Sequence, residues 1–228
     1  MAKKGAKERL LRVLITLEYS NPPIWREVAV LPDITLGELH DVIQIVMGWD
    51  DDHLHQFCQK LKRSTRPSYE EQNRYYRAAK WDDDFDARIR GRKFFVPKRA
   101  PDGTPINIDG TDEDAVLLAV VCPDASARLT YEYDFGDSWK HEIKVKRAGG
   151  PEPGAEYPIC LGGQRACPPD DCGGIWDYYS ILQAVSDPDH EQHEDAVDWL
   201  GPKFDPDAFD LKKVNQELAR WRKRRHRA

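Results

Sequence analysis

Hydrophobic residues at every second position predict two strands near the beginning of the chain. Val13, Ile15 and Leu17 recur in this way within residues 9–19, and residues 24–31 show the same alternation. Asn21-Pro22-Pro23 separates the two segments, and this combination is typical of a turn.

A helix is predicted next, because hydrophobic residues recur at intervals of three and four: Leu36, Leu39, Val42, Ile43, Val46 and Met47. Thr35 and Glu38 have the spacing of a capping box, and Gly48 suits the end of the helix. The polar residues Glu38, Asp41 and Gln44 are expected on the solvent side. Residues 53–61 then predict a third strand.

Residues 62–113 interrupt this regularity with many charged residues, glycines and prolines. We interpret them as a long insertion with a helical part at 69–79 and a hairpin around 101–103. A short helix is expected after Asp112, ending at Cys122-Pro123.

The segment 128–147 predicts an antiparallel hairpin with one hydrophobic face, formed by Leu129, Tyr131, Tyr133, Phe135, Trp139, His141, Ile143 and Val145. Its other face carries acidic residues on the first strand and lysines on the second, which favours antiparallel pairing. A Gly/Pro-rich connector at 149–158 precedes three expected helices at 174–186, 190–200 and 206–226.

Together these elements predict an α+β fold: a β-grasp-like mixed sheet with a crossing helix, a long insertion and a C-terminal helical layer. We expect residues 1–147 to form the α+β core, including the insertion at 62–113. Residues 148–228 are expected to supply the connector and C-terminal helices, packed on the same domain.

The charge of the chain is unevenly distributed. Its 34 basic and 40 acidic residues give a net charge of −6, but the first twelve residues carry +4 and the last ten +6, which leaves −16 on the other 206. An acidic body argues against a broad nucleic-acid surface. Nucleic-acid contact is therefore expected only through the C-terminal tail, with a solvated helix end as the alternative. The tail candidates are Arg220, Arg222, Lys223, Arg224, Arg225 and Arg227.

No signal segment or apolar run of about 20 residues precedes or interrupts these elements, so a cytoplasmic protein without a membrane span is expected. The chain has five cysteines, an odd number that cannot pair completely within one chain, which favours reduced thiols. Cys160, Cys167 and Cys172 lie close in sequence but lack the C-x2-C spacing typical of zinc knuckles. They are weak metal candidates, and no cofactor is expected.

Histidines and carboxylates within the hairpin and the preceding loops form a second set of candidates. His53, His55, Asp137 and His141 are candidate catalytic residues, and the three histidines are weak metal candidates as well. A divalent metal is therefore possible. The alternative is that these histidines are hydrogen-bonded core residues. Asp134-Phe135-Gly136 matches the Asp-Phe-Gly motif of protein kinases, but the other kinase motifs are absent from the sequence. We therefore interpret these residues as part of the hairpin turn.

Several motifs resemble one family. They are LGELHDVIQIVMGWDDDHLHQF, YEYDFGDSWKHEI, CPPDDCGGIWDY and FDPDAFDLKKVN. The chain resembles the Ri-plasmid open-reading-frame-three-like proteins, also called transposon passenger TnpR-like proteins. The resemblance implies a compact α+β fold and an association with mobile elements, but no known reaction, because the family is biochemically uncharacterised.

We therefore expect a binding or interaction module in which the Trp49–Phe57 and Asp134–His141 segments form one cluster. Its partner is expected to be an unknown protein or a small polar ligand. The expected binding residues are Trp49, Asp134, Asp137, Trp139, Asp170 and Asp171. The alternatives are a metal-dependent or acid–base enzyme, and an accessory protein that contacts nucleic acid through its tail.

Overall fold

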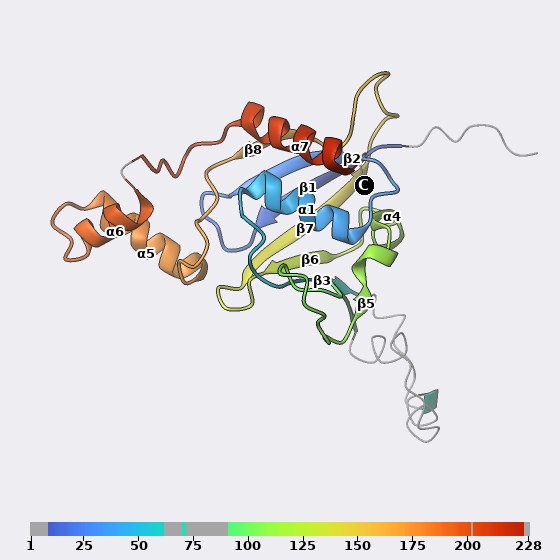
Figure 1. The fold of residues 1–228 in the computed structure, drawn as a ribbon, viewed down its shortest axis with the longest axis horizontal. Coiled ribbons are helices and arrows are strands. Elements are labelled where there is room, and N and C mark those ends of the chain that lie inside the picture. Colours follow the sequence, from blue (N-terminus) through green and yellow to red (C-terminus); the bar gives the residue numbers. More distant parts are fainter. Residues whose placement is uncertain (1–8, 62–69, 72–90, 202, 226–228) are drawn as a thin grey trace, which may run out of the picture.

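A computed structural model describes residues 9–61, 70–71, 91–201 and 203–225 of the chain. Its central feature is an eight-stranded sheet in the order β5-β4-β3-β6-β7-β1-β2-β8 (Figure 1). The strands are β1 (Leu11–Leu17), β2 (Trp25–Val30), β3 (His55–Lys60), β4 (Arg92–Val96), β5 (Thr111–Asp112), β6 (Leu129–Tyr133), β7 (Trp139–Arg147) and β8 (Ile159–Gln164). Only β4 and β5 pair in parallel among these strands, so the sheet is mixed.

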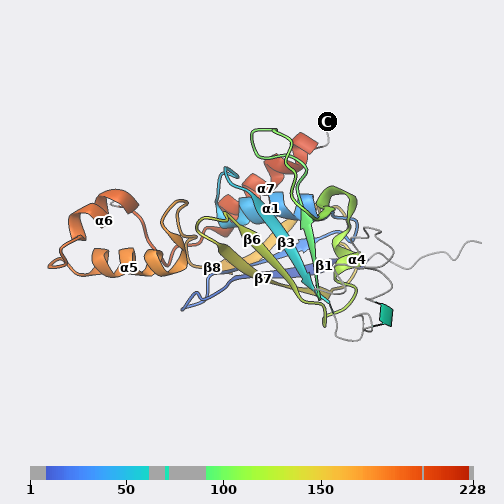
Figure 2. The same cartoon turned by 90° about the horizontal axis from the view of Figure 1, so that it is seen from below.

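Two helices lie side by side over one face of this sheet, as Figures 1 and 2 show from different directions. They are α1 (Leu36–Met47) and α7 (Leu211–Arg225). Alternate residues of the central strands point toward them, and Val13, Ile15 and Tyr131 are fully buried there. The expected α+β fold with a crossing helix and a C-terminal helix is confirmed.

The sequence explains where α1 begins and ends. The Thr35 hydroxyl accepts a hydrogen bond from the Glu38 backbone, the Glu38 carboxylate accepts one from the Thr35 backbone, and Gly48 ends the helix in a left-handed conformation. The expected exposure of Gln44 was wrong, because this residue is only 4% exposed. Its amide is buried because the hydroxyl of Tyr131 gives it a hydrogen-bond partner.

The hairpin of β6 and β7 has the predicted faces with one exception. Tyr131 and Tyr133 are fully buried, whereas Phe135 lies in the turn and is 42% exposed. On the opposite face Lys140 forms an ion pair with Glu132. The oppositely charged residues of the two strands therefore lie on the polar face that the sequence predicted.

Strand β8 has no counterpart in the sequence prediction, which recognised only a connector before it. It pairs with β2 at the sheet edge and lies under α7, where Asn215 hydrogen-bonds both backbone groups of Cys160. The expected helix at 69–79 lies outside the described residues except for 70–71. Within the second half of the insertion, Arg99 and Pro105 form a bridge around a turn at 101–103.

Two short helices follow β5, and two further helices lie between β8 and α7. The 3-10 helix η2 (Glu113–Ala115) and α4 (Leu118–Val121) lead into β6. Helices α5 (Gly174–Ser186) and α6 (His193–Leu200) pack on each other and project beyond the edge of the sheet (Figure 2). None of the described helices combines the length and apolar character that crossing a membrane requires.

Candidate functional site

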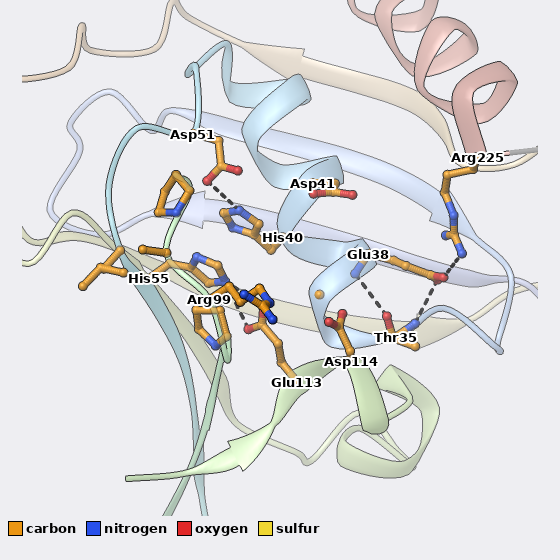
Figure 3. A pocket seen from close by; sticks show the side chains of 15 residues that line it. Thr35, Glu38, His40, Asp41, Asp51, His55, Arg99, Glu113, Asp114 and Arg225 are labelled. Atoms are coloured by element: carbon orange, nitrogen blue, oxygen red, sulfur yellow. Dashed lines mark hydrogen bonds and ion pairs between the residues drawn. The ribbon is translucent and has the colours of Figure 1, made fainter. Parts of the chain in front are cut away.

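A cleft of about 580 Å³ opens between α1, the loop before β3, the 97–101 segment and η2. Figure 3 shows that the polar side chains along its wall converge from these separate elements. Two histidines and several carboxylates line it, together with Arg99 and Arg225. The cleft therefore brings together the residue types that bind metal ions or transfer protons.

His40 lies at the centre of one wall, and both nitrogens of its ring have partners. Nε2 lies 2.8 Å from Oδ1 of Asp51, and Nδ1 lies 2.8 Å from the Tyr131 hydroxyl. The Gln44 amide donates a hydrogen bond of 2.9 Å to the same hydroxyl. His40 and Gln44 reach one hydroxyl because residues four apart share a helix face.

Local backbone geometry brings Asp51 back over α1. After Gly48 ends the helix the chain reverses toward β3, and Asp51 itself has a positive φ of 60°. Aspartate tolerates this conformation better than most residues. The turn places the Asp51 carboxylate, 42% exposed, against a histidine ring that is 6% exposed.

His55, the first residue of β3, forms the second histidine–carboxylate pair. Its Nε2 lies 2.9 and 3.1 Å from the two carboxylate oxygens of Glu113 in η2. Burial lowers the pKa of His55, an effect that the hydrogen bond to Glu113 opposes. His55 is therefore neutral at neutral pH, and its Nε2–H donates to Glu113.

Gly37 allows η2 to approach α1. A Cβ atom at this position would lie 2.1 Å from Oδ1 of Asp114 and 3.5 Å from Oε1 of Glu113. The absence of a side chain therefore makes room for the Asp114 carboxylate, whereas the Glu113 distance would be an ordinary contact. Burial and the neighbouring charges of Glu113 and Asp112 raise the pKa of Asp114.

Helix α7 closes one side of the cleft. Arg225 forms an ion pair with Glu38, and the Trp221 indole donates a 2.9 Å hydrogen bond to Asp41. Burial raises the pKa of the Asp41 carboxyl. The C-terminal helix is thus attached to α1 by polar contacts at the rim of the cleft.

His53 does not belong to this cleft, although it lies two residues before His55. Its ring lies between two carboxylates, with Nδ1 3.9 Å from Asp134 and Nε2 3.5 Å from Asp171. Asp170 is close by, and burial raises its pKa to about 6. This second group joins the β3 entry, the hairpin turn and the 168–173 loop. Asp137 holds the same loop by accepting a 3.1 Å hydrogen bond from the Gly173 backbone.

His141 and the two predicted binding tryptophans form part of the core. His141 is fully buried, Trp139 is 1% exposed and Trp49 is 7% exposed. The His141 Nδ1–H donates to the Trp139 carbonyl, and burial lowers its pKa to about 3. The Trp49–Phe57 and Asp134–His141 segments do lie together, and these three rings contact one another within the core.

The structure also shows where most of the candidate cysteines and basic tail residues lie. The metal-donor groups found among the described residues contain no cysteine, and burial raises the pKa of Cys172 to about 12. Cys160 is buried, and burial raises the pKa of Cys167. In the tail, Arg222 donates to the Pro158 carbonyl and Arg220 pairs with Glu217. Lys223 and Arg224 extend α7, and Arg227 lies outside the described residues.

Sequence reasoning identified His55, but it missed His40, Glu113 and Tyr131 as site residues. His40 was hidden within the helical stripe, one position after Leu39. A histidine at a buried position of an amphipathic helix is a detectable signal, since it needs a polar partner. Nothing local indicated that Glu113, 58 residues from His55, would be that residue's partner.

Comparisons with known proteins agree with this fold. The model of the family described as "plasmid pRiA4b ORF-3-like protein" matches residues 9–213. The uncharacterized protein y4hQ of Sinorhizobium fredii is 30% identical over 223 residues, covering 96% of this chain and 97% of the relative. A crystal structure of a protein of unknown function, MM3350 from Methanosarcina mazei Go1, aligns with a TM-score of 0.69. It is 30% identical, over 91% of this chain and 98% of that one. The chain belongs to the plasmid pRiA4b ORF-3-like family.

Proposed function

We propose that this protein is a binding module whose ligand is a divalent first-row transition-metal ion held in the α1 cleft. One observation carries the proposal: donor atoms of His40, Asp51 and His55 all lie within 4.8 Å of one another. Two imidazoles and one carboxylate are a donor set that suits such ions and leaves coordination positions open. Magnesium and calcium prefer oxygen donors alone, so they are the poorer fit.

The spacing is close to what a metal ion requires. Two atoms bound to one ion at about 2.1 Å lie at most about 4.2 Å apart, so the donors would have to move closer by a small distance. The His40 and His55 rings are only 4° from parallel, so their in-plane lone pairs do not converge, and one ring would also have to turn to share an ion. The ion would replace the N–H hydrogens that now connect the imidazoles to Asp51 and Glu113. Glu113 is then available as a fourth ligand, and Tyr131 orients His40 from its other nitrogen.

The alternative is an acid–base enzyme that uses the same histidine–carboxylate pairs without metal. The 2.8 Å contact between His40 and Asp51 favours it, because a carboxylate orients an imidazole for proton transfer. However, His40 and His55 are only 4% and 5% exposed, which restricts direct contact with a substrate. A small ion reaches such buried nitrogens more readily than a substrate does.

Titration calorimetry of the chelator-treated full-length protein with Zn²⁺ and Co²⁺ tests the proposal. We expect one ion per chain, with affinity reduced more than about 100-fold in His40→Phe and His55→Phe. The donor atoms of His53, Asp134 and Asp171 also lie within 4.8 Å of one another, so His53→Gln tests that second group and should leave binding of the ion in the cleft unchanged. His190→Gln, which lies outside both groups, is the matched control. Circular dichroism verifies that each variant folds. Absence of stoichiometric binding, or equal binding by a folded His40→Phe protein, would contradict the proposal.

A cytoplasmic location and an association with mobile elements form part of this proposal, and they rest on the sequence alone. The same holds for nucleic-acid contact through the tail. The ion pair of Arg225 with Glu38 reduces the charge that the tail offers to a phosphate backbone.

A further inference from the structure

A buried row of hydrogen bonds runs from Gln44 through Tyr131 to His40, behind the cleft. Gln44 and His40 are each 4% exposed, and Tyr131 is fully buried. The Tyr131 oxygen lies 2.9 Å from the Gln44 amide nitrogen and 2.8 Å from Nδ1 of His40. Gln44 Oε1 is buried without a hydrogen-bond partner among the described residues.

With the Gln44 amide in this orientation, the hydrogen bonds favour one tautomer of His40. The buried Tyr131 hydroxyl accepts from the amide of Gln44, and its own hydrogen is bonded only if Nδ1 of His40 accepts it. The other tautomer would make the Tyr131 oxygen accept twice and leave its hydrogen buried without a partner, which is costly. In the favoured arrangement Nδ1 carries no proton, and the ring proton is on Nε2, where it is donated to Asp51. In this form Nε2 has no lone pair for a metal ion.

Rotating the amide of Gln44 by half a turn reverses the direction of both hydrogen bonds in this row. Oε1 then accepts the Tyr131 hydrogen, and the Tyr131 oxygen accepts a hydrogen from Nδ1 of His40. The ring stays neutral, because the proton lost from Nε2 is matched by one on Nδ1. The Nε2 lone pair now faces Asp51 and the cleft. Without a cation this orientation is unfavourable, since lone pair and carboxylate repel each other.

We propose that Gln44, acting through the Tyr131 hydroxyl, determines which nitrogen of His40 carries the proton and therefore whether His40 can bind a metal ion. This inference rests on the metal-binding function proposed above. Gln44 and Tyr131 are positioning residues, because neither contacts the ion. The metal-free protein holds the proton on Nε2, and the metal-bound protein holds it on Nδ1.

Two substitutions of similar size at one position test this mechanism. Gln44→Met removes the amide, so the Tyr131 hydrogen is committed to Nδ1 and the metal-binding tautomer is disfavoured. Gln44→Glu, as a carboxylate, only accepts hydrogen bonds and favours the reversed row. Because burial raises the pKa of a carboxyl group at this position, the variant is measured from pH 7 to 9 and compared where its zinc affinity relative to the unaltered protein no longer changes. We expect zinc affinity to fall about 10-fold in Gln44→Met and to be equal or higher in Gln44→Glu. Tyr131→Phe removes the hydroxyl that connects Gln44 with His40. In a Tyr131→Phe background, Gln44→Met and Gln44→Glu should therefore have the same zinc affinity.

The decisive measurement is the ring protonation of His40 by long-range proton–nitrogen NMR of histidine-labelled full-length protein. We expect the proton on Nε2 in the metal-free unaltered and Gln44→Met proteins, and on Nδ1 in Gln44→Glu and in the zinc complex. A tautomer unchanged by both substitutions, with zinc affinities within about 2-fold, would overturn the inference. If the unaltered protein binds no zinc, the metal function fails, and the metal-free tautomers of the two variants still decide the role of Gln44.

Discussion

The imidazole rings of His40 and His55 are stacked, with centroids 3.5 Å apart and planes only 4° from parallel. One ring comes from helix α1 and the other from strand β3, so the stack fixes the separation of helix and sheet at the cleft. Burial lowers the pKa of His55, and the charge that His40 would carry acts in the same direction. The lowered pKa of His55 suits it to bind a cation, because a neutral imidazole has no positive charge to lose first.

Gly37→Ala should show coupling with Asp114. Alanine in a helix is favoured over glycine by up to about 1 kcal/mol, but here its Cβ would collide with the Asp114 carboxylate. The Asp114 side chain is exposed and can rotate away at some cost, so we expect Gly37→Ala to stabilise the protein less by itself than in an Asp114→Ala background. Urea unfolding of the four proteins of this cycle measures the coupling. Equal effects in both backgrounds would show that η2 does not pack against α1 as described.

His141→Phe should make the protein less sensitive to mild acid. The folded pKa of His141 is about 3, below the unfolded value near 6.5, so the unfolded state binds more protons between these values. Stability through this group is complete above pH 6.5 and is lost as the pH falls. From pH 7.5 to 5 the unaltered protein should lose about 2 kcal/mol more than His141→Phe. Urea unfolding at both pH values checks this, and parallel profiles would argue against a neutral buried His141.

Asp170→Asn is expected to act in the opposite direction. Burial raises the folded pKa of Asp170 to about 6, so the folded state binds more protons between about pH 4 and 6. Stability through this group is therefore lost as the pH rises through that window. Asp170→Asn should raise the melting temperature at pH 7.5 and have less effect at pH 5. Asp171→Asn is the control, since the Asp171 side chain is 78% exposed. A pH-independent effect of Asp170→Asn would contradict the assignment.

Trp221→Ala should loosen α7 from the sheet. Trp221 is 8% exposed, and its indole donates to Asp41, so removing it creates a cavity and leaves a carboxylate unpaired. We expect a loss of about 3 kcal/mol in the free energy of unfolding. Trp176→Ala is the matched control, because Trp176 is 68% exposed, and it should change stability by less than about 1 kcal/mol. Similar losses in both variants would show that α7 contributes no special stability.

The sequence by itself determined the elements whose signals are local. Hydrophobic periodicity located β1, β2, α1 and the hairpin of β6 and β7, and the Thr35–Glu38 pair located the start of α1. These signals are reliable because a helix or strand that buries one face must repeat its hydrophobic residues with its own period. The motifs also carried the family resemblance, which the comparisons confirmed.

Only the tertiary structure decided the composition of the candidate site. His40 joins His55 and Glu113 because α1 crosses β3 and η2 packs against Gly37, and neither contact has a signature in local sequence. The same applies to β8, an edge strand without alternation of hydrophobic and polar residues, which forms because β2 pairs with it and α7 packs on it. His53 and His55 share a two-residue spacing, yet strand β3 begins only at His55, so the two rings enter different groups. Spacing in sequence fixes which face a residue occupies, whereas the packing of distant elements determines which donors meet there.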